Sequence, residues 1–265
     1  MKKIFLFCIA LCTLAACDEI EENERFSDEP VTFTPLKNVL VEDFTGQNCL
    51  NCPNAADATH ALQKLYGEDH VIAVAIHGGG LKLPLPDTNP MQLATALGDE
   101  YNTFWKVETW PNGMVDRTGL RSYTSWSAEA VKRMQIEAPV EIQAGLVANN
   151  DEEEASDNVT MEVQLKALEA VDGKLQVWLV EDDITAPQRM PDGTMNTAYV
   201  HQHVLRTSVN DPYGDAVSLA KGEEKSVKLE CELRTNWKRE NLSIVAFVFN
   251  DKDGVLQVVK AKLFE

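Results

Sequence analysis

Two cysteines three positions apart are the residues of this chain best suited to chemistry. They lie in the stretch "GQNCLNCPNAAD" (residues 46–57) as Cys49 and Cys52, and Pro53 follows directly. A pair at this spacing can be a redox dithiol, half of a zinc site or a small structural disulfide. The compartment, the surrounding elements and the other ligands that the chain offers decide among these three.

The N-terminus predicts export. In "MKKIFLFCIALCTLAAC", Lys2 and Lys3 precede an apolar run and two small residues before Cys17. This is the layout of a secretory signal peptide over residues 1–16, too short for a permanent membrane helix. The cysteine after "LAA" resembles a bacterial lipobox, which predicts lipidation of Cys17. The alternative is an ordinary signal peptide followed by an incidental cysteine.

Charge excludes one class of partner. The chain has 24 Lys and Arg against 42 Asp and Glu, and the leader would remove two lysines and no acids. A body this acidic repels phosphate backbones, so we expect no nucleic-acid partner. The acidic stretch over residues 17–37 reads as a solvated tether, and residues 149–158 as a hairpin loop.

Cysteine counting disfavours zinc. Once the leader is removed and Cys17 is lipidated, only Cys49, Cys52 and Cys231 remain. A structural zinc site needs four Cys or His ligands, usually in two close pairs. His201 and His203 have bidentate spacing on an expected strand, but no third ligand accompanies them, so we expect exposed strand histidines. Cys231 is expected to be a buried small side chain, and no metal or cofactor is expected.

The elements around the cysteines favour redox chemistry. Residues 37–45, "KNVLVEDFT", and 70–77, "HVIAVAIH", read as buried strands. Between them, "NCPNAADATHALQKLYG" reads as a helix that Gly67 ends. This β-α-β unit places Cys49 at a helix N-terminus, where unpaired amides and the macrodipole stabilise a thiolate.

Residues 38–134 resemble a thioredoxin-fold domain. Asp43 lies six residues before Cys49, where thioredoxins keep a buried acid that accepts the proton of the second cysteine. Trp110-Pro111 matches their cis-proline loop, which faces the dithiol. Glu42 beside Asp43 leaves open which acid points inward, because neighbours on a strand face opposite sides.

The chain also resembles the twenty-eight-kilodalton outer-membrane protein family of Bacteroidetes lipoproteins, through "VEDFTGQNCLNCP", the lipobox and its length. The resemblance implies an outer-membrane lipoprotein with a thioredoxin-like domain and a β-rich domain, but no particular reaction. Leu50-Asn51 replaces the Gly-Pro of thioredoxin, and Asn48 replaces the tryptophan before the first cysteine. Since the central pair tunes the dithiol potential, oxidant and reductant stay open.

The second half of the chain alternates apolar and polar residues in seven short segments, from "VEIQAGLVA" to "VLQVVKAKLF". This pattern predicts an antiparallel, immunoglobulin-like β-sandwich over residues 137–265, after a thioredoxin-like domain over residues 38–136. The fold class is therefore α/β plus all-β. The segment after His77, "GGGLKLPLPDTNP", either roofs Cys49 or only connects elements.

Two functions from different classes remain. In the first, a thiol-disulfide oxidoreductase acts on protein substrates: Cys49 attacks, Cys52 resolves, Asp43 shuttles the proton, and Trp110-Pro111 aligns the substrate. In the second, the disulfide is structural and the protein is a non-catalytic scaffold that binds a surface partner. Fold alone does not choose between them.

Overall fold

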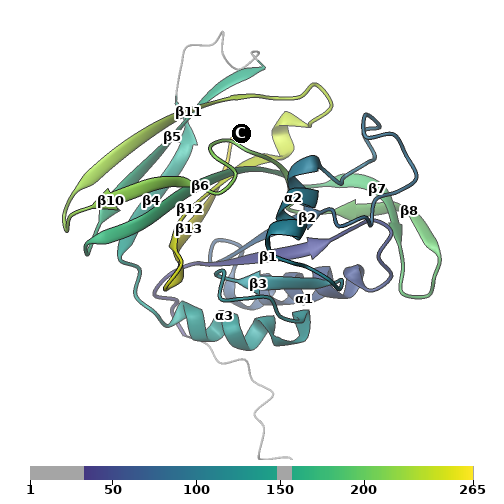
Figure 1. Ribbon diagram of the computed structural model, residues 1–265, viewed down its shortest axis with the longest axis horizontal. Helices are drawn as coiled ribbons and strands as arrows, with labels where there is room; N and C mark the ends of the chain where they lie inside the picture. Colours follow the sequence, from purple (N-terminus) through teal and green to yellow (C-terminus); the bar gives the residue numbers. More distant parts are fainter. Residues whose placement is uncertain (1–32, 148–156, 265) are drawn as a thin grey trace, which may run out of the picture. The chain divides into compact units, whose positions relative to one another are not determined.

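The computed structural model describes residues 33–147 and 157–264 (Figure 1). The signal peptide, Cys17, and most of the acidic tether and acidic loop lie outside these residues. Thr34–Glu265 forms one compact unit. Its helices and strands in chain order are β1 (Val39–Thr45), α1 (Cys52–Tyr66), β2 (Val71–His77), α2 (Ala96–Phe104), β3 (Asn112–Val115), α3 (Trp126–Met134), β4 (Val140–Leu146), β5 (Asn158–Ala167), β6 (Val171–Glu181), β7 (Ile184–Arg189), β8 (Met195–His201), β9 (Val204–Ser208), β10 (Asp215–Leu219), β11 (Glu224–Glu232), β12 (Leu242–Asn250) and β13 (Gly254–Lys262).

The strand β1 positions the cysteines. All of its residues are buried, including the polar Glu42, Asp43 and Thr45. It pairs with β2 in parallel and with β3 in antiparallel orientation. A parallel neighbour needs a crossover connection, and α1 supplies it. The two strands and the helix expected around the cysteines are confirmed.

The helices begin and end where local chemistry allows. Pro53 occupies the first turn of α1, where its missing N–H costs nothing, and Gly67 ends the helix with φ 92°. Thr95 caps α2 by accepting a hydrogen bond from the Gly98 N–H. Most of the segment "SAEAVKRMQI" (residues 127–136), whose apolar residues recur at helical spacing, lies in α3. In the described part of the chain, no helix is long and apolar enough to cross a membrane.

The sheet that holds β1 extends far beyond β2. Its order is β13-β12-β6-β9-β2-β1-β3, and β10 also pairs with β6. The joint is the parallel contact between β2 and β9, where the Ala75 N–H donates to the His203 carbonyl at 2.8 Å. Strands from both sides of residues 136–137 therefore share one sheet. The division into two domains stays a prediction; what the structure shows is a mixed α/β unit, mostly strands in several sheets.

A second, three-stranded sheet has the order β11-β5-β4 (Figure 1, left). On β5 buried and more exposed residues alternate, as the sequence pattern predicts. Its inward side chains share one apolar cluster with β6 and β12 of the larger sheet, including Met161, Val163, Val177 and Ile244. This cluster is the larger of the two main parts of the core.

The second half of the chain has more strands than the seven expected. Among the described residues, β4 to β13 are ten. The segment "AYVHQHVLRTS" splits into β8 and β9 because His203 takes a left-handed conformation, φ 57°. His201 and His203 are therefore not on one strand, and His201 is buried, which corrects the expectation of exposed histidines. Cys231 is only partly buried on the outer strand β11, which corrects the expectation of a core position.

The β7–β8 hairpin is an element that the sequence pattern did not predict. It leaves β6 at Asp183, φ 56°, and returns to β9 at His203. Asp182 braces this base by accepting hydrogen bonds from the His203 ring at 2.7 Å and from Lys260 at 2.8 Å. Burial raises the pKa of Asp182, but the hydrogen bonds and charges of His203 and Lys260 lower it by more. The net result is a pKa below the usual range of an aspartate. The hairpin is thereby fixed at its root.

A buried ion cluster ties the start of β1 to the end of the chain. Asp116 is fully buried and accepts hydrogen bonds from Lys37, from Arg133 Nε at 2.8 Å and from the Leu40 N–H at 2.9 Å. Lys37 also donates to the Val255 carbonyl at 2.6 Å. Three charged groups and two backbone groups thus satisfy one another in the interior.

We expect Asp116→Ala to lower the free energy of unfolding by about 3–5 kcal/mol, because two buried cations lose their shared counter-ion. The matched control is Glu169→Gln, which breaks the exposed ion pair with Lys221 and should cost at most about 1 kcal/mol. Denaturant unfolding of both variants measures the difference. Equal costs would contradict the structural role assigned to Asp116.

Candidate functional site

The two cysteines lie at the junction between β1 and α1. Cys49 and Cys52 form a disulfide with their Cα atoms 5.5 Å apart. The helix begins at Cys52, so Cys49 lies in the loop that leads into its N-terminal end. Only 6% of Cys49 and 2% of Cys52 is exposed. The pair is a nearly closed-in disulfide at the N-terminal end of a helix.

Adjacent acids on β1 have opposite environments. Glu42 and Asp43 are both buried. Glu42 accepts hydrogen bonds from Arg117 at 3.2 Å, and the Arg117 guanidinium lies over the Phe249 ring at 4.2 Å. Asp43 faces the other way and lines a cavity together with Cys52. The sequence left open which of the two acids faces the cysteines. Their contacts show that Asp43 does, whereas Glu42 faces Arg117.

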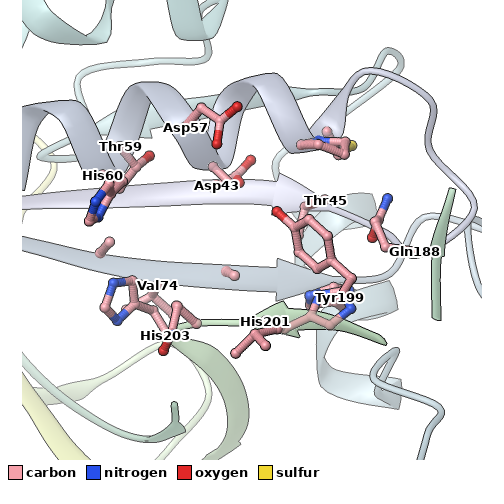
Figure 2. Close-up of a pocket in the computed structure, with 18 of the residues that line it drawn as sticks. Asp43, Thr45, Asp57, Thr59, His60, Val74, Gln188, Tyr199, His201 and His203 are labelled. Carbon is pink, nitrogen blue, oxygen red and sulfur yellow. The ribbon is translucent and has the colours of Figure 1, made fainter. Parts of the chain in front are cut away.

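Asp43 is a buried carboxyl with an unsatisfied atom. Its Oδ1 has no hydrogen-bond partner among the described residues. Burial raises the pKa of Asp43 from 3.8 to about 8. In Figure 2 the Asp43 side chain reaches from β1 toward α1, beneath Asp57. A carboxyl with this pKa can give and take a proton near neutral pH.

Trp110-Pro111 lies at the same end of the sheet as the cysteines. Its peptide bond is cis, as expected. Asn112 pairs with Phe44 near the end of β1, so Pro111 comes level with the point where the cysteine loop leaves the strand. Trp110 donates from Nε1 to Asn102 Oδ1 at 2.8 Å.

Gly79 explains how close the loop after β2 approaches Trp110. A Cβ at Gly79 would lie 2.3 Å from the Trp110 ring, and the residue has φ 68°. Only glycine fits both conditions. The loop also contacts the cysteine loop, because the Asn48 N–H donates to the Leu81 carbonyl at 2.9 Å. The segment after His77 therefore lies against the candidate site and does more than connect elements.

Gln47 joins three segments beside the disulfide. Its side-chain amide donates to the carbonyls of Met91 and Pro187, both at 2.9 Å, and its Oε1 accepts from the Leu93 N–H at 2.9 Å. Its carbonyl accepts from the Arg189 N–H at 2.8 Å. Gln47 thereby fastens the cysteine loop to β7 and to the loop before α2.

Gln188 on β7 reaches the cysteine loop from the other side. Its Nε2 donates to the Cys49 carbonyl at 3.0 Å and to the Arg189 carbonyl at 3.0 Å, and more weakly to the Gly46 carbonyl at 3.4 Å. Its side chain is buried. The hairpin thus covers the disulfide and fixes the carbonyl of its first cysteine.

Behind the disulfide is a cavity of about 210 Å³ between α1, β1, β2 and β8 (Figure 2). Four of the chain's five histidines line it, namely His60, His77, His201 and His203. Burial lowers the pKa of His201 to about 4, and that of His77 also falls. His77 Nδ1 and His201 Nε2 have no hydrogen-bond partner in the described chain. Both imidazoles are therefore neutral at physiological pH.

The cavity also holds Tyr199 from β8, whose pKa rises through burial and through the nearby carboxylates of Asp57 and Asp43. Within the described ranges, no three His, Cys, Asp or Glu side chains come close enough together to hold a metal ion.

Sequence reasoning found Cys49, Cys52, Asp43, Trp110 and Pro111, and the structure brings them to one end of the sheet. It did not single out Gln47, Gln188, Tyr199 or His60. The hairpin strand "ITAPQR" contains a proline and little alternation, so no local signal marked it as a strand. Only the long-range pairing of β6 with β9 brings the hairpin to the cysteines.

The family model of the outer membrane protein Omp28 matches residues 98–265. The chain belongs to this family. No curated protein matches it. Among solved structures, HBP35 of Porphyromonas gingivalis aligns with a TM-score of 0.66 at 18% identity, over 86% of this chain and 75% of that one. A domain of the outer membrane lipoprotein Omp28 from the same organism aligns at 24% identity and TM-score 0.34, over 48% of this chain and 88% of that one.

Membership of the Omp28 family confirms the expected location of the protein at the outer membrane. The likeness to HBP35 supports the fold at low identity and says nothing of the chemistry. The site residues are therefore interpreted from their own geometry.

Asp43 should make stability depend on pH. Because its folded pKa of about 8 lies above the unfolded value of 3.8, the folded protein binds more protons between these values, and stability falls as pH rises through this window. Asp43→Asn should not lose stability in this pH window. Its free energy of unfolding should therefore rise relative to that of wild type by about 1.4 kcal/mol for each pH unit within the window.

Urea unfolding of wild type and Asp43→Asn at a series of pH values measures this effect. The matched control is Asp57→Asn, which changes an exposed carboxylate of the same cavity and should leave the pH dependence of stability as in wild type. Parallel stability curves for wild type and Asp43→Asn would contradict the raised pKa.

Proposed function

We propose that this Omp28-family lipoprotein is a thiol-disulfide oxidoreductase of the cell envelope, built on a thioredoxin-like unit of β1, α1, β2, α2 and β3. The observation that carries the proposal is the buried, unpartnered carboxyl of Asp43 in the same cavity as Cys52. A structural disulfide needs no proton acceptor behind it, and burying such a group costs stability.

In the reducing direction, the Cys49 thiolate attacks one sulfur of a client disulfide and expels the other as a thiolate, which takes up a proton. Asp43 accepts the proton of Cys52, whose thiolate then attacks Cys49 Sγ and releases the second client thiol. The client disulfide gains two electrons and the Cys49–Cys52 pair loses them. The reverse sequence oxidises a client dithiol.

Each neighbouring group has a part in this scheme. The N-terminal end of α1 stabilises negative charge at the dithiol. Asp43, with a pKa of about 8, holds and releases a proton in the range where thiols titrate. The loop at Trp110-Pro111, level with the end of β1, offers backbone groups to a client strand beside the disulfide.

A second function, a non-catalytic surface binder, has one observation in its favour. Gln47, Gln188 and the loop at Leu81 enclose the disulfide, so that 6% of Cys49 and 2% of Cys52 is exposed. A structural disulfide would be protected in this way. The two functions differ in one measurable property, the reactivity of Cys49.

The reduced protein should show unequal thiols. Cys49 should titrate below the free-thiol value of about 8.5 and be alkylated well before Cys52. Cys52→Ser should accumulate mixed disulfides with envelope proteins, because nothing resolves them, whereas Cys49→Ser should accumulate none. Mass spectrometry of trapped adducts, with a reduction potential for the wild-type pair, measures this. Equal, slow alkylation without adducts would favour the binder.

Lipidation of Cys17 is a separate prediction. The mature wild-type protein should partition into the detergent phase, and Cys17→Ala should stay uncleaved or appear in the aqueous phase. Phase partition and the mass of the N-terminal peptide measure the outcome. A mature wild-type N-terminus without lipid would refute the role of Cys17 and leave the thiol chemistry untouched.

A further inference from the structure

The strand β8 has an open edge. It pairs with β7 alone in the two-stranded sheet of the described chain. Its sequence "MNTAYVH" contains no charged residue and no proline, and most of it is exposed. Met195 and Val200 are among the exposed large apolar residues. An uncharged, exposed edge strand is a template on which another extended chain can pair.

Two other outer strands of the molecule carry charged residues. β11, at the edge of the three-stranded sheet, has the sequence "EKSVKLECE" with five charged residues in nine. β13, at the end of the larger sheet, carries Lys260 and Lys262. Charges on an edge prevent unwanted pairing. β8 has no such charges, although the chain as a whole is strongly acidic. Its edge is therefore open to pairing with another extended chain.

The open strand is attached to the disulfide. β8 is held by β7, and β7 supplies Gln188 and Arg189, whose hydrogen bonds fix the cysteine loop. β8 also faces α1 across the cavity, with Tyr199 and Val200 on one side and Pro53 on the other. A chain bound along β8 is therefore brought beside the dithiol.

The cavity beneath β8 offers acceptors without a cation. Asp43 Oδ1 and His201 Nε2 are buried and unpartnered, and Asp57 lies at the same cavity. Burial lowers the pKa of His201 to about 4, so the neutral ring keeps one nitrogen as an acceptor. Among the described residues, no Lys or Arg lines the cavity. A hydrogen-bond-donating, basic side chain complements this set.

We propose that β8 binds an extended segment of the client polypeptide as an added strand, and that the cavity receives a basic side chain of that segment. This inference rests on the proposed oxidoreductase function for its use, because it assigns how the client is recognised. Main-chain pairing tolerates many sequences, and the carboxylate of Asp57 together with the neutral acceptors of the cavity adds a preference for lysine or arginine. The substrate class is thus unfolded or extended, basic polypeptide.

Ala198 gives a sharp test. Its N–H donates to Asn196 Oδ1 at 3.0 Å, at the bulge where β7 carries Pro187, and so lies outside the ladder with β7. An added strand can replace Asn196 Oδ1 as the acceptor of this N–H. Ala198→Pro removes that donor while keeping the hairpin ladder, since proline is tolerated at edges and bulges. Ala198→Ser keeps the N–H and is the matched control.

Both variants are assayed for reduction of an unfolded polypeptide disulfide and of a small aromatic disulfide. Ala198→Pro should lose about tenfold or more in kcat/KM toward the polypeptide alone, and Ala198→Ser should behave as wild type. Equal losses on both substrates, or no loss in Ala198→Pro, would overturn the proposal. A wild type inert toward both disulfides would refute the oxidoreductase function instead.

A second measurement needs no variant and no redox step. Oxidised wild-type protein is mixed with a cysteine-free extended peptide carrying one central lysine, and hydrogen exchange of β8 is followed. Protection of β8 amides by the lysine peptide, and weaker protection by its glutamine counterpart, supports the proposal. In Asp57→Asn, the lysine and glutamine peptides should protect the β8 amides to more similar extents than in wild type. Unprotected β8, or equal protection by both peptides, overturns it whatever the reductase assays show.

Discussion

Buried polar side chains on and beside the first strand, with one exception, find their partners in distant parts of the chain, and the molecule is arranged around this constraint. Lys37 reaches Asp116, Glu42 reaches Arg117, and Gln47 reaches the hairpin and the loop before α2. Each partner lies far along the chain, so each bond fixes a distant segment on β1. Because a buried polar group without a partner is costly, these bonds determine where the later elements can lie.

Asp43 departs from this pattern on the same strand. It is flanked by groups that are fully paired, yet its Oδ1 has no partner among the described residues. The same β-strand alternation that turns Glu42 to Arg117 turns Asp43 to the cavity beside Cys52. The neighbouring buried acids Glu42 and Asp116 both have cationic partners, so the fold could also have provided a partner for Asp43. Groups left unsatisfied in this way are expected where chemistry needs them.

Local patterns predicted what is local. The strand–helix–strand unit around Cys49 and Cys52, the short helix α3 and the cis bond before Pro111 follow from apolar runs, helix signals and a short motif. What local patterns missed depends on pairing between distant strands. The hairpin strand β7 contains Pro187 and lacks clear alternation, and the break between β8 and β9 depends on the left-handed His203. For the same reason His201 was expected outside, although the fold buries it.

The hairpin also changes what can be inferred from the motif alone. In isolation, a cysteine pair at the start of a helix predicts a thiol open to attack. Here Gln188 and Arg189 donate hydrogen bonds to the carbonyls of Cys49 and Gln47 in the loop, and the cysteines are nearly closed in. A client must therefore approach along the surface that the hairpin leaves open. The hairpin has both features: β7 restricts access to the disulfide, and β8 presents an open edge. The two are compatible if a client first pairs with β8 and thiol–disulfide exchange follows. The same hairpin then limits access to the disulfide and aligns the chain that reaches it.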